Sequence, residues 1–187
     1  MGSEMCIRDR LTLEDLLNGL LLYSGNDNAV AIADHIAGST EKFAEMMNAE
    51  AKKLMATNSH FVNPSGLHDD NHYTTAYDLY LIFNECIKHD DFVKIINSSS
   101  YTAHITGADG TKRDVKWEPT NYYAKGEATP PDNVTIIGGK TGTTKGAGNC
   151  LILLTKDSSG NPYISIIMGA GSKPLLYQDM TSMLSKI

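Results

Sequence analysis

The spacing of apolar residues changes near residue 100, and this change limits the folds that the chain can adopt. Before that point apolar residues recur at helical spacing, which is typical of amphipathic helices. After it they form short runs separated by turn residues, which is typical of strands. Helices followed by strands and a closing helix predict an α+β domain, in which a helical cluster packs on an antiparallel sheet.

Capping signals help to place the helices. Thr12 followed by Asp15, and Thr75 followed by Asp78, resemble capping boxes, and Gly38 is typical of a helix end. Helices are predicted over residues 12–23, 29–37, 39–54, 75–87, 91–97 and 174–186. Strands are predicted over residues 101–107 and 113–121, as a hairpin, and over 133–142, 149–157 and 163–171. The last helix is expected to face the sheet with Leu175, Leu176, Met183 and Leu184.

Size, charge and cysteine content exclude several classes of protein. With 187 residues, 41% of them hydrophobic, one domain with a sizeable core is expected. A formal net charge of −6 and the lack of a basic cluster argue against nucleic acid as a partner. Three cysteines without CxxC spacing indicate neither a zinc site nor a disulfide framework. Since His68 and His72 have no third ligand at useful spacing, no metal and no other cofactor is expected.

Lys140 stands in the stretch IIGGKTGTTKGAGNCLILL, residues 136–154, where a cation follows paired glycines. The letters GKT match the end of the phosphate-binding motif GxxxxGK[ST], but Val134 occupies the place of its first glycine. That motif also needs a helix after the lysine, whereas the next apolar run is typical of a buried strand. The stretch is therefore interpreted as an edge strand that carries a lysine and hydroxyl groups.

A second motif, Ser24-Gly25-Asn26, breaks two apolar helical segments. An S-x-N motif followed much later by K-T-G resembles the penicillin-recognising serine enzymes. Longer segments resemble the D-alanyl-D-alanine carboxypeptidases, and the similarity runs from about Leu11 to the C-terminus. These segments are LTLEDLLNGLLLYSGNDNAVAIADHIAGS, FAEMMNAEAKKL, SHFVNPSGL and HYTTAYDLYLIF. The resemblance implies a β-lactamase/transpeptidase-like fold.

The resemblance also implies a substrate and residues that bind it. In this family a peptidoglycan stem peptide ending in D-Ala-D-Ala lies along the K-T-G strand as an added strand. Its terminal carboxylate would be attracted by Lys140 and the hydroxyls of Thr141 and Thr143, while Gly142 would leave room for the peptide backbone. Gly138 and Gly139 are expected to widen that access.

Catalytic roles are implied for four residues. Ser24 would pass a proton to the departing D-alanine, and Asn26 would hold the substrate backbone and the nearby catalytic lysine. The backbone amide of Thr143 would form part of the oxyanion hole, and Lys140 would attract the carboxylate. β-Lactams would inhibit the complete enzyme. The family acts outside the cytoplasmic membrane, so contact with a membrane is expected only through an anchor in a longer parent chain.

The third motif of the family, S-x-x-K, supplies the acylated serine and its activating lysine, and it should precede S-x-N. The sequence has this pattern only at Ser39–Lys42, after S-x-N, where Ser39 is expected to be a helix N-cap. Residues 1–10, including CIRDR, are therefore interpreted as a non-native or irregular start, and 11–187 as a partial carboxypeptidase domain. The nucleophile helix and the first strands would be missing, and this chain would be inactive.

Two other functions stay open. A class A β-lactamase shares these motifs but needs a glutamate-bearing loop for deacylation, and HFVNPSGLHDD offers no glutamate. Alternatively, the chain could be a noncatalytic module that binds wall peptide through the edge of its sheet.

Overall fold

The computed structural model describes residues 9–187 and confirms the α+β prediction. The helices are α1 (Leu13–Asn18), the π-helical turn η1 (Gly19–Tyr23), α2 (Asn26–Ala37), α3 (Thr40–Lys53), α4 (Ala76–Cys86), α5 (Asp90–Ile96), α6 (Tyr122–Lys125) and α7 (Lys173–Leu184). The strands are β1 (Tyr101–Thr106), β2 (Lys112–Trp117), β3 (Val134–Thr144), β4 (Gly148–Asp157) and β5 (Pro162–Ala170). Most of the predicted irregular start, residues 1–8, lies outside the described residues. No helix within residues 9–187 has the length and apolarity to cross a bilayer.

The helix starts predicted at Thr12 and Thr75 are confirmed by side-chain caps, whereas α2 begins at Asn26, before the predicted residue 29. The Thr12 hydroxyl accepts a hydrogen bond from the Asp15 amide at 3.1 Å, and the Asp15 carboxylate accepts from the Thr12 amide at 2.8 Å. Thr75 caps α4 in the same way, by accepting from the amide of Asp78. α2 ends at Gly38, whose positive φ of 80° is a left-handed conformation that suits glycine. Local polar signals therefore fix where these helices begin and end.

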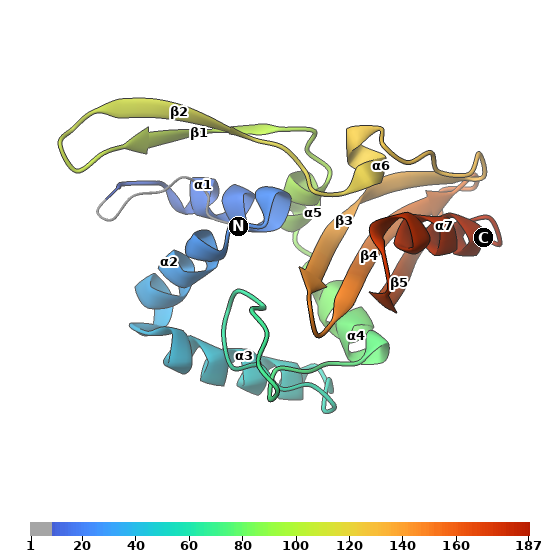
Figure 1. Ribbon diagram of the computed structural model, residues 1–187, viewed down its shortest axis with the longest axis horizontal. Coiled ribbons are helices and arrows are strands. Elements are labelled where there is room, and N and C mark those ends of the chain that lie inside the picture. Colours follow the sequence, from blue (N-terminus) through green and yellow to red (C-terminus); the bar gives the residue numbers. More distant parts are fainter. Residues whose placement is uncertain (1–8) are drawn as a thin grey trace.

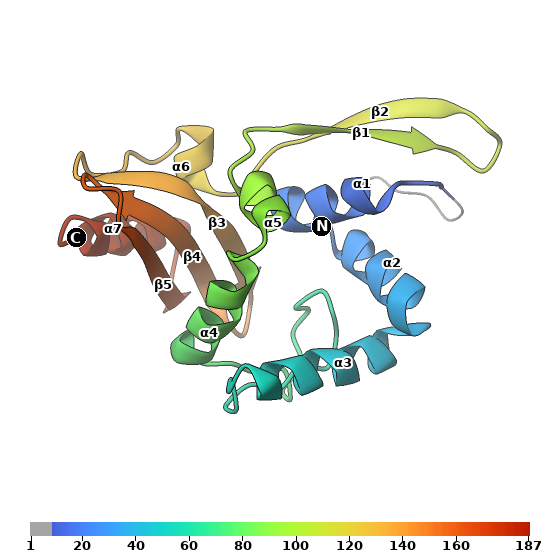
Figure 2. The same cartoon turned by 180° about the vertical axis from the view of Figure 1, so that it is seen from behind.

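The five strands form two sheets rather than one (Figure 1). β3, β4 and β5 form an antiparallel sheet in that order, so β3 is an edge strand of it, as predicted. β1 and β2 form a separate antiparallel hairpin, which Figures 1 and 2 show extending away from the larger sheet beside α1. The inner side chains of the hairpin pack with Leu11 and with Tyr23 of η1, and this contact holds the hairpin against the helices.

The three-stranded sheet is covered on both faces because side chains alternate along β4. Leu151 and Leu153 point to α7, where they share a core with Leu176, Tyr177, Met180 and Leu184. The opposite face, with Ile152 and Leu154, packs on α4 and α5 through Phe83 and Ile96. The prediction that Leu175 faces the sheet is wrong, since 43% of its surface is exposed. Tyr177 and Met180 are buried instead, because they share a helix face with Leu176 and Leu184.

Candidate active site

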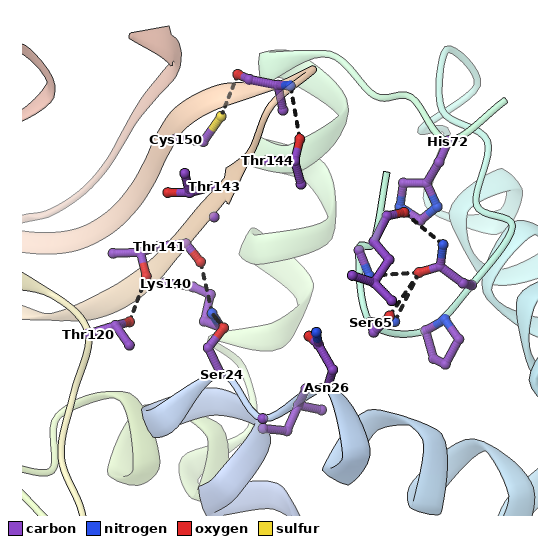
Figure 3. A pocket seen from close by; sticks show the side chains of 18 of the residues that line it. Ser24, Asn26, Ser65, His72, Thr120, Lys140, Thr141, Thr143, Thr144 and Cys150 are labelled. Atoms are coloured by element: carbon purple, nitrogen blue, oxygen red, sulfur yellow. Dashed lines mark hydrogen bonds between the residues drawn. The ribbon is translucent and has the colours of Figure 1, made fainter. Parts of the chain in front are cut away.

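Ser24 and Asn26 are placed by the break between η1 and α2. Ser24 ends the π-helical turn in a left-handed conformation, with φ of 68° and ψ of 38°, which is strained for a residue other than glycine. Asn26 is the first residue of α2. The two segments pack very closely, since a Cβ added at Gly19 would lie 2.3 Å from the side-chain nitrogen of Asn28. Both side chains point into the same cleft (Figure 3).

Lys140 reaches Ser24 from β3. It pairs with Ile152 across the sheet and therefore projects from the face that packs on α4 and α5. Its Nζ donates hydrogen bonds to Ser24 Oγ at 2.6 Å and to the carbonyl oxygen of Thr141 at 2.8 Å (Figure 3). No ion pair joins Lys140 to a carboxylate of residues 9–187, and burial lowers its pKa from 10.5 to about 8. At neutral pH the site thus holds an ammonium with one N–H left for a ligand.

Thr141, Gly142 and Thr143 follow Lys140 along the edge strand β3. Thr141 Oγ1 lies 2.6 Å from Thr120 Oγ1, whereas the exposed Thr143 makes only a long contact of 3.4 Å with Asn149 Oδ1. A Cβ at Gly142 would meet no atom closer than 4.0 Å, so a side chain there would occupy the cleft. Glycine therefore leaves that space open.

The prediction that Gly138 and Gly139 widen access is wrong. A Cβ at Gly138 would lie 2.2 Å from the carbonyl oxygen of Ile96, and one at Gly139 would lie 2.1 Å from that of Ile152. These glycines let α5 and β4 approach the backbone of β3 closely. Their role is therefore in packing.

A loop between α3 and α4 forms the opposite wall of the cleft. Its turn is organised by Asn63, whose Oδ1 accepts hydrogen bonds from the amides of Ser65 and Gly66. Farther along this loop, the ring of His68 lies against Gly146 in the β3–β4 turn. A Cβ added at Gly146 would lie 2.5 Å from Cε1 of that ring. The letters NPSG are typical of a turn, but nothing in them shows that the turn faces Lys140. Sequence reasoning therefore missed this wall.

His68 and His72 of this loop differ in their surroundings. His68 is exposed, whereas His72 is half-buried, lines the cleft and accepts a hydrogen bond from the Val62 amide at 3.2 Å. Burial is the main cause that lowers the pKa of His72. Within residues 9–187 no group of three or more His, Cys, Asp or Glu side chains could hold a metal ion.

The end of the cleft beside α6 is aromatic and basic, and sequence reasoning missed it as well. The rings of Tyr122 and Tyr177 stack with centroids 4.6 Å apart, and the Tyr122 amide donates to the Tyr177 hydroxyl at 2.9 Å. Lys173, the first residue of α7, lies over the Tyr122 ring at 5.5 Å. These residues stand singly on α6 and α7, so no short motif in the sequence indicates that they meet.

Together these walls enclose a cleft of about 730 Å³ between the helices and the sheet. All of the predicted site residues line it: Ser24, Asn26, Lys140, Thr141, Gly142 and Thr143. Ser39 and Lys42 do not, and Ser39 Oγ instead accepts a hydrogen bond from the amide of Lys42 as the N-cap of α3. No Asp or Glu of the described chain lines the cleft. The arrangement suits an anionic ligand, because it offers a cation and hydroxyl donors without an opposing carboxylate.

Comparison with known proteins adds sequence evidence. A family model for D-alanyl-D-alanine carboxypeptidase matches residues 2–172. The D-alanyl-D-alanine carboxypeptidase DacF of Bacillus subtilis is 30% identical over 190 aligned residues, which cover 98% of this chain and 45% of DacF. DacD of Escherichia coli is 34% identical over 166 residues, which cover 88% of this chain and 39% of DacD. The chain thus spans less than half the length of these two relatives.

Solved structures show the same fold. The crystal structure of the Streptomyces K15 DD-transpeptidase superposes with a TM-score of 0.88 at 29% identity, covering 98% of this chain and 70% of that one. A penicillin-binding protein homologue from Mycobacterium tuberculosis superposes with a TM-score of 0.77 at 29% identity, covering 94% of this chain and 63% of the other. The chain belongs to the D-alanyl-D-alanine carboxypeptidase family.

Proposed function

We propose that this chain carries the substrate-binding part of a serine-type D-Ala-D-Ala carboxypeptidase that acts on peptidoglycan stem peptides outside the cytoplasmic membrane. The observation that carries the proposal is the 2.6 Å hydrogen bond from Lys140 to Ser24, which joins the K-T-G and S-x-N motifs across the cleft. Each motif alone is short and occurs in many unrelated proteins. Their convergence at one cleft supports the shared site that the family resemblance implies.

In this proposal each residue has a distinct task. The third N–H of Lys140 and the hydroxyls of Thr141 and Thr143 attract the terminal carboxylate of the peptide, whose backbone lies along the edge of β3. The Thr143 amide contributes to the oxyanion hole, a contribution of about 3 kcal/mol in comparable sites. Ser24 passes a proton to the departing D-alanine, and Asn26 holds the peptide backbone.

The acyl-enzyme mechanism needs a nucleophile, and the described cleft does not provide one at Ser39. Because Ser39 caps α3 and does not line the cleft, it cannot meet a carbonyl that is bound beside Lys140. We therefore propose that the acylated serine belongs to an S-x-x-K segment that this chain lacks, and that this chain does not turn over peptide. β-Lactams would acylate only the complete enzyme.

The same observation favours a second candidate, a noncatalytic module that binds wall peptide. A chain that has a site for a carboxylate but no serine positioned to attack the peptide would bind wall peptide without cleaving it. A class A β-lactamase is less well supported, because deacylation there uses a glutamate, and the described residues that line the cleft include no carboxylate.

A titration with a fluorescently labelled peptide ending in D-Ala-D-Ala, run beside an assay for released D-alanine, tests the proposal. We expect saturable binding, weaker binding of the peptide ending in L-Ala-L-Ala, and no release of D-alanine. The Lys140→Ala variant should lose binding, while Lys42→Ala, which changes the lysine of the S-x-x-K pattern at Ser39, should keep it. Equal binding by the wild-type chain and Lys140→Ala would exclude the proposed site, and release of D-alanine would show that this chain holds a nucleophile.

A further inference from the structure

Thr120 contacts the K-T-G strand although it belongs to neither motif. Its Oγ1 lies 2.6 Å from Thr141 Oγ1, and both residues line the cleft (Figure 3). Thr120 follows β2 and therefore approaches the site from the segment that leaves the hairpin. The contact links this segment directly to a hydroxyl that the proposed function uses for binding.

The position of Thr120 is fixed by its neighbours. Pro119 and Asn121 on either side are buried. The Asn121 side chain accepts a hydrogen bond from the Tyr123 amide at 3.0 Å and so caps α6. Three residues before Thr120, the buried ring of Trp117 packs with Tyr23 and Tyr101. The backbone that carries the Thr120 hydroxyl is therefore held from both sides.

The direction of the hydrogen bond between the two hydroxyls decides what the cleft offers a ligand. A hydroxyl has a single proton. If Thr141 donates to Thr120, its proton is used and only a lone pair faces the ligand. If Thr120 donates to Thr141, the proton of Thr141 is free to point into the cleft. An anion bound beside the Lys140 ammonium favours the second arrangement, because a chain of aligned O–H groups ending on an anion is mutually polarised.

We propose that Thr120 is a positioning residue that orients the Thr141 hydroxyl as a donor to a ligand carboxylate. It thereby makes the cleft prefer peptides with a free C-terminal carboxylate over peptides whose C-terminus is an amide. This inference rests on the proposed function and deepens it, since it assigns selectivity for the terminal group to a residue outside the S-x-N and K-T-G motifs.

Calorimetric titration of the 187-residue chain with N-acetyl-D-alanyl-D-alanine and with its C-terminal carboxamide tests the inference. Thr120→Val removes the hydroxyl at nearly constant shape, and Thr120→Ser keeps it. We expect Thr120→Val to weaken binding of the acid by about fivefold, the effect of one typical hydrogen bond, and to leave binding of the carboxamide within about twofold. Thr120→Ser should bind both ligands as the wild type does. Thr102→Val, on the exposed face of β1, is the matched control for loss of a threonine hydroxyl.

A double-mutant cycle separates orientation from packing. In a Thr141→Val background, Thr120→Val should cause no further loss, because there is no hydroxyl left to orient. Equal selectivity in Thr120→Val and the wild type would overturn the inference, and so would an equal loss in Thr120→Val and Thr120→Ser. If Thr120→Val does not fold, Thr120→Ala takes its place with the same expectation. A wild-type chain that binds neither peptide, or binds both equally, would overturn the proposed function itself, and is thus distinguishable from failure of the inference alone.

Discussion

Raising the pH through 8 should weaken the binding of a carboxylate-terminated peptide to this chain. The reason is the environment of Lys140, whose pKa is lowered by burial from 10.5 to about 8. Deprotonation removes the positive charge that faces the ligand. An ordinary exposed lysine would stay charged to well above pH 9, so the effect identifies the buried lysine rather than lysines in general.

The size of the effect follows from the shift. At pH 7 about nine-tenths of the Lys140 side chains are protonated, and at pH 9 about one-tenth are. If the neutral amine contributes no attraction, the affinity falls by about tenfold for each pH unit above 8.

The lowered pKa of Lys140 also affects folding stability, because it corresponds to about 3 kcal/mol that disfavours the buried charge. Between pH 8 and 10.5 the unfolded chain binds a proton here that the folded chain does not, so this group makes the free energy of unfolding rise with pH. Stability and ligand affinity should therefore change in opposite directions over this range.

Fluorescence anisotropy of a labelled D-Ala-D-Ala peptide between pH 6.5 and 9.5 measures the affinity, and urea denaturation over the same range measures stability. The C-terminal carboxamide is the control ligand, and its affinity should change much less. Cys150→Ser controls for the thiol that lines the same cleft. An affinity for the acid that stays constant to pH 9.5 would refute the reasoning, because it would show that the charge of Lys140 does not act on the ligand.

Three further predictions concern the nucleophile, the core and the sheet. The purified chain should form no covalent adduct with a fluorescent penicillin in intact-mass measurement, and an adduct mapped to Ser39 would show that the S-x-x-K at that position is functional after all. Met180→Ala should lower the free energy of unfolding by about 2–5 kcal/mol, because Met180 is fully buried, whereas Leu175→Ala on the exposed side of the same helix should change it by less than about 0.5 kcal/mol. Gly138→Ala should cost about 1–3 kcal/mol in urea denaturation, because its Cβ would meet the Ile96 carbonyl oxygen, and an unchanged midpoint would contradict the close approach.

Features of the fold that depend on local chemistry could be predicted from the sequence. Thr12, Ser39 and Thr75 each place a hydroxyl where the first amides of a helix lack partners, so the letters themselves indicate the starts. The two site motifs could also be predicted, because each is a continuous run of three residues. In both cases the information lies within a few neighbouring residues.

Features that depend on tertiary contacts could not be predicted. The hairpin separates from the larger sheet because its inner side chains pack with Leu11 and Tyr23, which are remote in sequence. Met46 is an apolar residue at helical spacing in α3, yet half of its surface is exposed, because the helical period does not say which helix face has a neighbour. Thr120 is a single polar residue after a strand, and only the folded chain brings it to Thr141.

The left-handed backbone of Ser24 has a consequence for directed evolution. Strain of this kind costs of the order of 1 kcal/mol, which glycine would relieve, and asparagine in part. A screen that rewards only heat resistance would therefore enrich Ser24→Gly and discard the hydroxyl that Lys140 contacts. A screen that rewards ligand capture would retain serine and accept the lower stability. Position 24 is thus a place where the two kinds of selection should separate within a single library.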